Sequence, residues 1–307
     1  RILIQGADHR CRVLGAAAAG AMNREVRNVT SSTYIKMMGQ TCAVNLSVHF
    51  GTTGRLLPTG TACTSGSLAI GEAYEAIKFG RQDVMIAGGA EEFSVTQVAV
   101  FDTLFATSRK NDTPELTPRA YDINRDGLVI GDGAGTLILE EYEHARARGA
   151  TILAEVVGFG TNTDGRHVTQ PQAVTMGEAL KLALSDAGLN ADKIGYVNSH
   201  GTATDLGDVA ECEAMKQALG EARPAVSTIK NYTGHTLGAC GAIEAIMTIE
   251  MMRHGWFAPN LNLTEVDPRC AGHDFITGSG RSFETDFVMS NNFAFGGINT
   301  SLIFKRA

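Results

Sequence analysis

The sequence predicts a layered α/β fold, because short apolar runs alternate with stretches of helical periodicity along most of the chain. The clearest example starts at Cys63, where apolar residues recur close to helical spacing as far as a turn at Gly80. The apolar run at residues 83–87 follows this turn and ends in two glycines, so it reads as a buried strand. The same alternation recurs at residues 194–198 and 208–219, which extends the prediction to the second half of the chain.

The other elements continue this alternation. In the first half we expect, in chain order, a strand at residues 1–5, a small-residue helix or loop at 15–22, one helix within 30–49, an apolar segment at 93–105 and a strand at 136–139. In the second half we expect a short charged helix at 143–148, helices at 176–188 and 241–254, and strands at 152–160, 225–227, 287–290 and 300–305. The change around residues 141–150 predicts a boundary between two halves, 1–142 and 143–307.

Three glycines, Gly131, Gly133 and Gly135, precede the strand expected at residues 136–139. Alternating glycines can cradle a phosphate, but a dinucleotide-binding loop lies between a strand and the helix that follows it. These glycines lie before a strand, so we expect them to serve close backbone packing or a turn instead.

The composition excludes several classes of protein. The 307 residues are 44% hydrophobic and 19% charged, and the net charge is −7, which is typical of a compact enzyme and argues against general nucleic-acid binding. No apolar stretch approaches the roughly 20 residues that cross a bilayer, and no signal peptide is found, so we expect a cytoplasmic protein without a membrane partner. Six scattered cysteines without CxxC spacing indicate free thiols. Because the first residue is Arg rather than Met, we expect the numbering to begin inside a longer polypeptide.

Cys63 is the first candidate for chemistry. It stands at the start of the helix that ends near Gly80, where unpaired backbone N–H groups and the positive helix end favour a thiolate. Such a position lowers the pKa of a thiol from its usual ~8.5 and makes the sulfur a nucleophile. The alternative is a small buried residue on a core helix, which is the commoner role of an isolated cysteine.

Three more polar clusters lie next to predicted strand ends, where α/β enzymes build their sites. YVNSHGTATDLGD at residues 196–208 carries His200 into a glycine-threonine turn, and STIKNYTGHTLGACG at residues 227–241 places Lys230 and His235 before an apolar helix. SNNFAFGGINT is a glycine-rich turn with two phenylalanines before the last strand. His200 could simply cap a turn and Lys230 could be a solvated surface residue, but the neighbouring glycines would let a substrate approach closely.

Together these motifs resemble those of the β-ketoacyl-acyl-carrier-protein synthases, the elongating condensing enzymes of the KAS I and KAS II types. The matching motifs are TACTSGS around Cys63, NSHGTATDLGD around His200, KNYTGHTLGACGAIEA around Lys230 and His235, and SNNFAFGGIN near the end. The resemblance runs from about residue 30 to the last strand and is specific, because four separated motifs agree. It implies a thiolase-like fold of two related halves in an α-β-α-β-α arrangement, with the front of the family's chain missing.

The resemblance implies a decarboxylative condensation in fatty-acid elongation. Cys63 would take an acyl group from the phosphopantetheine thioester of acyl carrier protein, and the N–H groups of Cys63 and Phe295 would form an oxyanion hole. Phe295 also matches a gating ring, with Phe293 beside it. Malonyl-acyl carrier protein would lose CO2 while His200 and His235 donate to its thioester oxygen, and the carbanion would then attack the acyl group to give 3-oxoacyl-acyl carrier protein. The enzyme would need no cofactor of its own, because the phosphopantetheine arrives on the carrier protein.

Other matching residues would have supporting roles. Lys230 would add positive charge near the histidines, and Glu211 would hold Lys230 in position. The hydroxyl groups of Thr202 and Thr204 match positions that bind the pantetheine arm. Some relatives hold a monovalent cation near the active site, although hydrogen bonding among the same polar residues is an equal alternative; the matching positions are Asn198, Glu211, Glu244, Ser290 and Asn291.

The resemblance also implies partners. Condensing enzymes of this kind are dimers, and the helix after Cys63 and the strand at residues 83–87 would lie near the interface. Arg24 and Arg27 match a region that docks the acidic carrier protein, with solvated surface arginines as the alternative. A thiolase is disfavoured, because the chain has Asn299 where thiolases carry a second cysteine. A ketosynthase of polyketide or aryl-polyene synthesis, and a non-catalytic subunit or other member of a heterodimer with a ketosynthase-like partner, are the alternatives left open.

Overall fold

The computed structural model describes residues 2–4 and 30–307. Its helices are α2 (Ser31–Met37), α3 (Thr41–Phe50), α4 (Ser65–Lys78), α5 (Val95–Thr103), α6 (Tyr142–Ala147), α7 (Ala173–Ala187), α8 (Asp205–Leu219), α9 (Lys230–Thr233) and α10 (Cys240–His254). Its strands are β1 (Ile2–Ile4), β2 (Val84–Glu91), β3 (Gly133–Glu140), β4 (Ala154–Thr163), β5 (Ile194–Asn198), β6 (Ala225–Ser227), β7 (Trp256–Phe257), β8 (Asp274–Phe275), β9 (Arg281–Ser282), β10 (Phe287–Ala294) and β11 (Ile298–Arg306). None of the described helices combines the length and the apolar character that crossing a bilayer would require.

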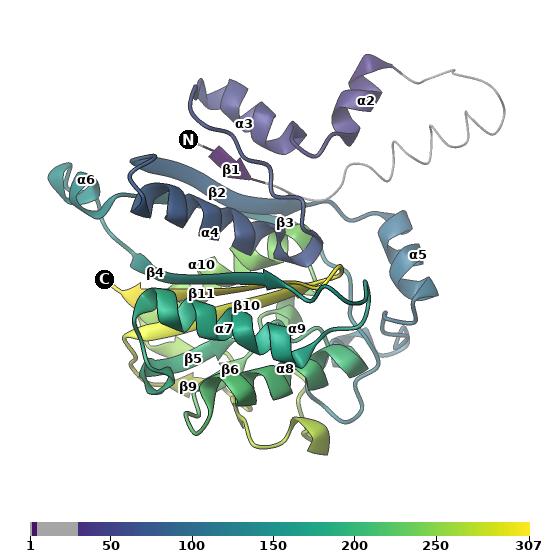
Figure 1. Ribbon diagram of the computed structural model, residues 1–307. Coiled ribbons are helices and arrows are strands. Elements are labelled where there is room, and N and C mark those ends of the chain that lie inside the picture. The colour runs from purple at the N-terminus through teal and green to yellow at the C-terminus, as the bar shows by residue number, and fades with distance from the viewer. Residues whose placement is uncertain (1, 5–29) are drawn as a thin grey trace.

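These elements form five layers (Figure 1). Helix α3, with α2 beside it, lies on one face of a sheet of β1, β2 and β3, and helices α4 and α10 lie on the other face. The far side of α4 and α10 packs on a six-stranded sheet, which α7 covers from outside with α8 beside it. The predicted α-β-α-β-α arrangement is therefore confirmed, whereas the boundary between residues 142 and 143 stays a prediction.

The larger sheet brings the polar loops together. Its strand order is β4-β11-β10-β5-β6-β8, antiparallel from β4 to β10 and parallel from β10 to β8. In the parallel part, Asn198 of β5 lies between Ser290 of β10 and Ser227 of β6. Because the carboxyl ends of parallel strands meet at one edge of a sheet, the loops that follow β5 and β6 leave the sheet side by side.

Most predicted elements are present, and several of them differ from the prediction in their bounds. The helix predicted within residues 30–49 is two helices, α2 and α3. The strand predicted at residues 83–87 continues through its two glycines as β2, because Gly88 packs against β3 so closely that a Cβ would lie 2.0 Å from the carbonyl oxygen of Gly135. The segment at 15–22 lies outside the described residues.

Strand β3 begins at Gly133, so only Gly131 precedes it and the expectation that all three glycines lie before the strand is wrong, but Gly131 and Gly135 serve close packing, as predicted. A Cβ at Gly131 would lie 2.3 Å from the carbonyl oxygen of Thr233, and one at Gly135 would lie 2.9 Å from the backbone nitrogen of Ile243. Both contacts join this segment to elements that come more than a hundred residues later in the chain. The glycines therefore let the two halves approach each other, and the phosphate-binding reading is not needed.

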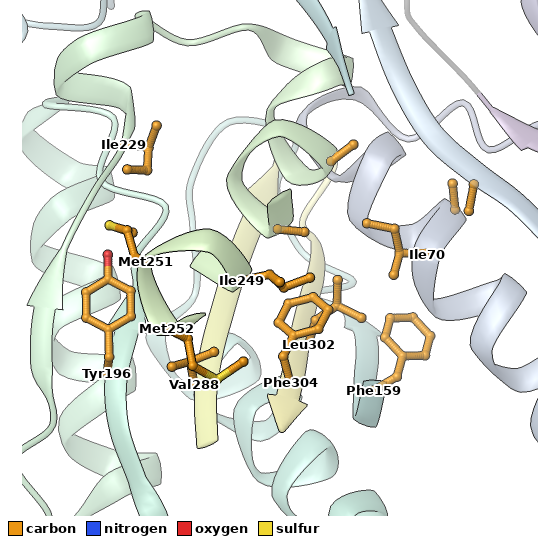
Figure 2. Close-up of a cluster of buried hydrophobic side chains, with 14 of the residues drawn as sticks. Ile70, Phe159, Tyr196, Ile229, Ile249, Met251, Met252, Val288, Leu302 and Phe304 are labelled. Carbon is orange, nitrogen blue, oxygen red and sulfur yellow. The ribbon is translucent and has the colours of Figure 1, made fainter. Parts of the chain in front are cut away.

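The main core lies between the central helices and the larger sheet. Figure 2 shows Ile249 and Met252 of α10 beside the strands that carry Leu302 and other apolar residues. Phe159 of β4 belongs to the same core and fills the space at Gly71 of α4, where a Cβ would lie 2.3 Å from its ring. This packing fixes α4, and with it the turn that precedes α4, against the sheet that carries the polar loops.

Helices α4 and α10 cross where small residues meet. A Cβ at Gly241 would lie 2.5 Å from the backbone nitrogen of Ser67, and one at Gly66 would lie 2.8 Å from that of Ala242. We expect Gly241→Ala to lower the free energy of unfolding by about 1–3 kcal/mol, because the added methyl group must separate two backbones. A urea titration measures the loss. The control is Gly177→Ala, whose Cβ would lie no closer than 3.2 Å to its neighbours, so the free energy of unfolding should fall less. An equal fall in both variants would contradict the prediction.

Candidate active site

Cys63 lies on a sharp turn at the entrance to α4. The turn is a short 3-10 segment, Ala62–Thr64, and Ala62 has a φ of 51°. A non-glycine residue with positive φ is uncommon and persists where its surroundings hold it. Here the Ser65 hydroxyl donates to the carbonyl oxygen of Ala62 and accepts from the N–H of Thr61. The α-helix therefore begins two residues after Cys63 rather than at it.

His235 contacts the sulfur of Cys63. The chain turns at Gly234, which has a φ of 68°, and the N–H of His235 donates to the carbonyl oxygen of Val129 at 2.7 Å. The ring Nδ1 accepts from the N–H of Leu237 at 3.2 Å, so the ring proton is on Nε2. Nε2 lies 3.1 Å from the Cys63 Sγ, and its N–H therefore donates to the sulfur.

His200 approaches the same sulfur from the end of β5. Its Nδ1 lies 3.1 Å from the Lys230 Nζ and 3.4 Å from the Asn292 Nδ2. Both of these nitrogens also donate to the carboxylate of Glu244, so they act as donors and Nδ1 is an acceptor. The His200 proton is therefore on Nε2 as well. The centroids of the two imidazoles are 5.2 Å apart with the rings nearly perpendicular, and ring nitrogens of both lie within 4.8 Å of the sulfur.

Burial keeps both imidazoles uncharged. It is the main cause that holds the pKa of His200 and of His235 well below the usual 6.5, and the positive charge of Lys230 lowers both further. Two neutral rings, each with its proton on Nε2, form a pair of hydrogen-bond donors. Such a pair is suited to stabilise negative charge that develops between them.

The expected low pKa of Cys63 is wrong. Burial raises the pKa of the Cys63 thiol to about 11, although the charge of Lys230 and the backbone N–H groups of Phe295 and of Cys63 itself act to lower it. The favourable helix end was a correct local observation, but the loss of water around the sulfur outweighs it. The resting group is therefore a thiol, surrounded by donors that stabilise the sulfur when it becomes negative.

Lys230 is held by Glu244 of α10. The ammonium forms an ion pair with this carboxylate, and both side chains are almost completely buried. Burial acts to lower the pKa of Lys230, but the neighbouring Cys240 and the carboxylate of Glu244 outweigh it, and the pKa is raised. The lysine is therefore charged, and its charge faces the Nδ1 of His200.

Glu211 has a different part from the one predicted. Its carboxylate accepts the backbone N–H groups of His200 at 2.7 Å and Gly201 at 2.8 Å, and the hydroxyl of Tyr121 at 2.8 Å. The prediction that Glu211 holds Lys230 is therefore wrong: Glu211 holds the backbone that carries His200, and Glu244 holds the lysine.

Sequence reasoning missed Tyr121, Asp208 and Asn292. Tyr121 is fully buried with a φ of 66°, and its N–H donates to Asp208, which also accepts the N–H of Ala203. Asn292 links Glu244 to the His200 ring. One signal was available for Asn292. It lies in the SNNFAFGGIN motif two residues after Ser290, and alternate residues of a strand such as β10 point to the same face.

Cys63, His200, His235 and Glu211 line a cavity of about 380 Å³. Thr202 and Thr204 line it as well, and their hydroxyl oxygens are 2.9 Å apart. The ring of Phe295 stacks on Phe101 with centroids 5.3 Å apart, and the ring of Phe293 meets the His200 ring edge-on at 5.9 Å. Part of the cavity lining is apolar, which suits an acyl chain; it includes Phe101, Leu104, Phe105, Leu128 and Phe295.

The structure brings together three of the five predicted cation ligands. The Asn198 side chain donates to Glu244 and Ser290 at 3.3 Å each, and its Oδ1 has no partner in the described part of the chain. Asn291 points to the other face of β10, where it accepts from Ser301, and Glu211 is engaged elsewhere, as described above. Hydrogen bonds account for the contacts among Asn198, Glu244 and Ser290. The feature that fits a cation is the Oδ1 of Asn198, which has no partner among the described residues.

The sulfur and the two imidazoles also have the spacing of metal ligands. The Cys63 Sγ and the ring nitrogens of His200 and His235 lie within 4.8 Å of one another, and this donor set suits zinc. Each Nε2, however, carries a proton, because fixed N–H donors face each Nδ1. A metal could bind a ring at Nε2 only by displacing this proton. The Nδ1 of the same ring cannot take the proton over, because a donor already faces it. The arrangement therefore fits a developing anion better than a cation.

Known proteins resemble this chain along most of its length. Residues 5–145 match the family model "Beta-ketoacyl synthase, N-terminal domain", and residues 153–264 match "Beta-ketoacyl synthase, C-terminal domain". The 3-oxoacyl-[acyl-carrier-protein] synthase 2 of Vibrio cholerae is 46% identical over 282 residues, which cover 90% of this chain and 67% of that protein. The 3-oxoacyl-[acyl-carrier-protein] synthase 1 of Escherichia coli is 39% identical over 302 residues, which cover 98% of this chain and 73% of that protein.

Solved structures give the same picture. A beta-ketoacyl synthase from Burkholderia phymatum superposes with a TM-score of 0.95 at 57% identity, and the match covers 100% of this chain and 76% of that one. The ishigamide ketosynthase/chain length factor gives a TM-score of 0.91 at 27% identity, covering 100% and 75%. A type II polyketide ketosynthase in complex with its acyl-carrier protein gives 0.88 at 28% identity, covering 100% and 77%.

Proposed function

Because this chain belongs to the β-ketoacyl synthase family, whose members are acyltransferases, we propose that it elongates fatty acyl chains by decarboxylative condensation. An acyl group on Cys63 combines with malonyl-acyl carrier protein, and the products are 3-oxoacyl-acyl carrier protein, CO2 and the free thiol. One observation carries this proposal: a sulfur and two Nε2–H donors meet in one cavity beside an apolar wall.

In the first step the Cys63 sulfur attacks the carbonyl carbon of the acyl thioester. The bond between that carbon and the pantetheine sulfur breaks, and the thiol proton leaves with the pantetheine sulfur. The backbone N–H groups of Phe295 and Cys63, which already favour negative charge at this place, donate to the carbonyl oxygen as it becomes negative. Each such donor contributes about 3–4 kcal/mol to the stability of the transition state. The His235 Nε2–H stabilises the sulfur as it loses its proton.

In the second step the malonyl thioester oxygen lies between the Nε2–H groups of His200 and His235. The bond from the malonyl carbon to its carboxylate breaks, CO2 leaves, and the electron pair forms an enolate that the two donors stabilise. The enolate carbon then attacks the acyl carbonyl carbon, and the Cys63 sulfur leaves and takes a proton. Lys230 keeps the His200 Nδ1 an acceptor, so the Nε2 proton stays directed at the substrate.

The carrier protein is the proposed partner for both substrates. One solved neighbour is a ketosynthase in complex with its acyl-carrier protein, which supports this proposal. The proposed docking residues Arg24 and Arg27 lie outside the described residues. We also propose that the enzyme works in the cytoplasm and as a homodimer, with α4 and β2 near the interface.

Fatty-acid elongation is favoured over the alternative pathways. Relatives named 3-oxoacyl-[acyl-carrier-protein] synthase are 39–46% identical to this chain, whereas the ishigamide ketosynthase/chain length factor is 27% identical and the type II polyketide ketosynthase is 28% identical. A non-catalytic role is disfavoured, because Cys63, His200 and His235 are all in contact with the same cavity.

The test follows the acyl group. Incubation with an acyl-acyl carrier protein should add the acyl mass to Cys63, as peptide mapping by mass spectrometry would show. Addition of malonyl-acyl carrier protein should then release 3-oxoacyl-acyl carrier protein and restore the free thiol. An acyl group found on another cysteine would overturn the assignment. An acylated Cys63 that malonyl-acyl carrier protein does not discharge would refute the condensation.

The pH dependence should lack a histidine step. Since the pKa of His200 and of His235 is well below 6.5, both rings stay neutral between pH 7.5 and 6, and we expect the condensation rate to change less than about twofold from their protonation. Below pH 6.5 these histidines gain protons only in the unfolded chain, so each lowers the free energy of unfolding as the pH falls, by up to about 1.4 kcal/mol per pH unit. Single-turnover rates and urea titrations of wild type and His235→Gln test both statements. A rate that falls with an apparent pKa near 6.5 would contradict the first statement, and a free energy of unfolding with the same pH dependence in both proteins would contradict the second.

A further inference from the structure

The turn between β5 and α8 is held by a segment of the first half of the chain. The N–H of Gly127 donates to the carbonyl oxygen of Ala203 at 3.1 Å. The Arg125 Nε donates to the carbonyl oxygen of Thr204 at 3.3 Å, and its Nη2 donates to that of Asp205 at 3.1 Å. Three consecutive carbonyl groups of the turn are therefore fixed by residues 125–127.

Arg125 is itself firmly anchored. Its side chain is only 2% exposed, and its Nη1 donates to the carboxylate of Asp267 at 2.7 Å and to the carbonyl oxygen of Asp122 at 2.9 Å. Its Nε also lies 3.5 Å from the carboxylate of Asp208. All three nitrogens of the guanidinium therefore donate to acceptors, and these acceptors lie in different directions. A lysine ammonium has the same charge but cannot span this set of acceptors.

The turn needs this support because its backbone is strained. Ala203 has a φ of 63°, which a residue with a Cβ adopts only where the surroundings enforce it. Asp208 of α8 accepts the N–H of Ala203 at 3.1 Å, while Gly127 holds the carbonyl oxygen of Ala203 and Arg125 holds those of Thr204 and Asp205. The outcome is that the hydroxyls of Thr202 and Thr204 lie together on the cavity wall.

We propose that Arg125 is a positioning residue for substrate binding, which holds the Thr202 and Thr204 hydroxyls where the pantetheine arm of the carrier protein passes. The inference rests on the proposed function, since it assumes that these hydroxyls receive the arm. Arg125 makes no contact with Cys63 or the histidines among the interactions described above. Its replacement should therefore weaken the binding of thioester substrates and leave the reacting groups in place.

The first measurement is a comparison of KM with kcat. For Arg125→Lys we expect KM for malonyl-acyl carrier protein to rise about tenfold or more, with kcat within about threefold of wild type. The rate at which iodoacetamide alkylates Cys63 should not change, because this reagent has no pantetheine arm. The matched control is Arg269→Lys: Arg269 pairs with Asp267 and Asp205 from the solvent side, and its replacement should leave KM within about twofold.

A double-mutant cycle tests whether Arg125 acts through the hydroxyls. Thr202→Val and Thr204→Val together remove both hydroxyls, and in this background Arg125→Lys should raise KM by less than about threefold, because the groups that it positions are gone. The same tenfold rise in both backgrounds would overturn the proposal. So would a KM no higher than that of Arg269→Lys, or a variant that no longer folds, which would show that Arg125 serves the fold rather than the turn. A wild-type protein that is not acylated on Cys63 would instead contradict the proposed function itself.

Discussion

Cys63→Ala should abolish condensation, with a loss of at least about 10⁴-fold, while decarboxylation of malonyl-acyl carrier protein continues. The two halves of the reaction use different groups. The sulfur carries the acyl chain, whereas the Nε2–H groups of His200 and His235 stabilise the enolate. The donors that face each Nδ1, and not the sulfur, keep the ring proton on Nε2. Alanine removes only the Sγ and leaves both donors in the cavity. The release of labelled CO2, measured beside the formation of 3-oxoacyl product, separates the two activities.

The control for this experiment is another buried thiol. Cys270 is fully buried in the second half of the chain and does not line the cavity, so Cys270→Ala should keep both activities. A Cys63→Ala protein that still condenses would remove Cys63 from the mechanism. One that neither condenses nor decarboxylates, yet melts at the wild-type temperature, would show that the histidine pair depends on the sulfur.

The parts of the fold that depend on local pattern could be predicted from the sequence. Strands β5 and β6 were predicted with the bounds that they have, because each is a short apolar run that ends at a polar cluster. The order of strands and helices then implied that these clusters lie at strand ends. The approach of Cys63, His200 and His235 within one cavity agrees with that expectation, although their chemical roles stay predictions until they are tested.

Contacts that depend on rotation and burial could not be predicted in this way. Glu211 and Glu244 both lie on helices that follow polar loops, and the sequence does not say which carboxylate faces Lys230. That choice depends on how α8 and α10 are turned against the sheet. The prediction of a low pKa for Cys63 was wrong for a related reason. A helix start is visible in the sequence, but the amount of water left around the sulfur depends on the whole cavity.

The supports that come from distant segments were the least visible. Tyr121 and Arg125 lie in a polar loop with no periodicity, some eighty residues before the turn and helix that they contact. Tyr121 has a positive φ, which no pattern of apolar residues indicates. Such residues were not recognised because their partners are set by the packing of one half of the chain on the other.

Breaking the Lys230–Glu244 pair should have the largest effect on stability. Either Lys230→Met or Glu244→Gln leaves one charge buried without its partner, which costs about 3–5 kcal/mol in the free energy of unfolding. The double variant removes both charges and should lose less than the sum of the two single variants. Urea titrations of all four proteins give the coupling energy. Single losses that simply add up would contradict a direct ion pair.

Lys230→Met should also impair the chemistry in a way that Glu244→Gln does not. Without the ammonium, the His200 Nδ1 loses one of the two donors that make it an acceptor, and only Asn292 at 3.4 Å continues to face it. The ring proton can then move to Nδ1, and the enolate loses one of its two donors. We therefore expect decarboxylation to fall by about 10²–10³-fold, as for the loss of a single oxyanion donor, with the rate of Cys63 alkylation by iodoacetamide little changed. Glu244→Gln keeps the lysine beside His200, so a folded Glu244→Gln variant should decarboxylate faster than Lys230→Met; the reverse order would show that the lysine does not act through the imidazole.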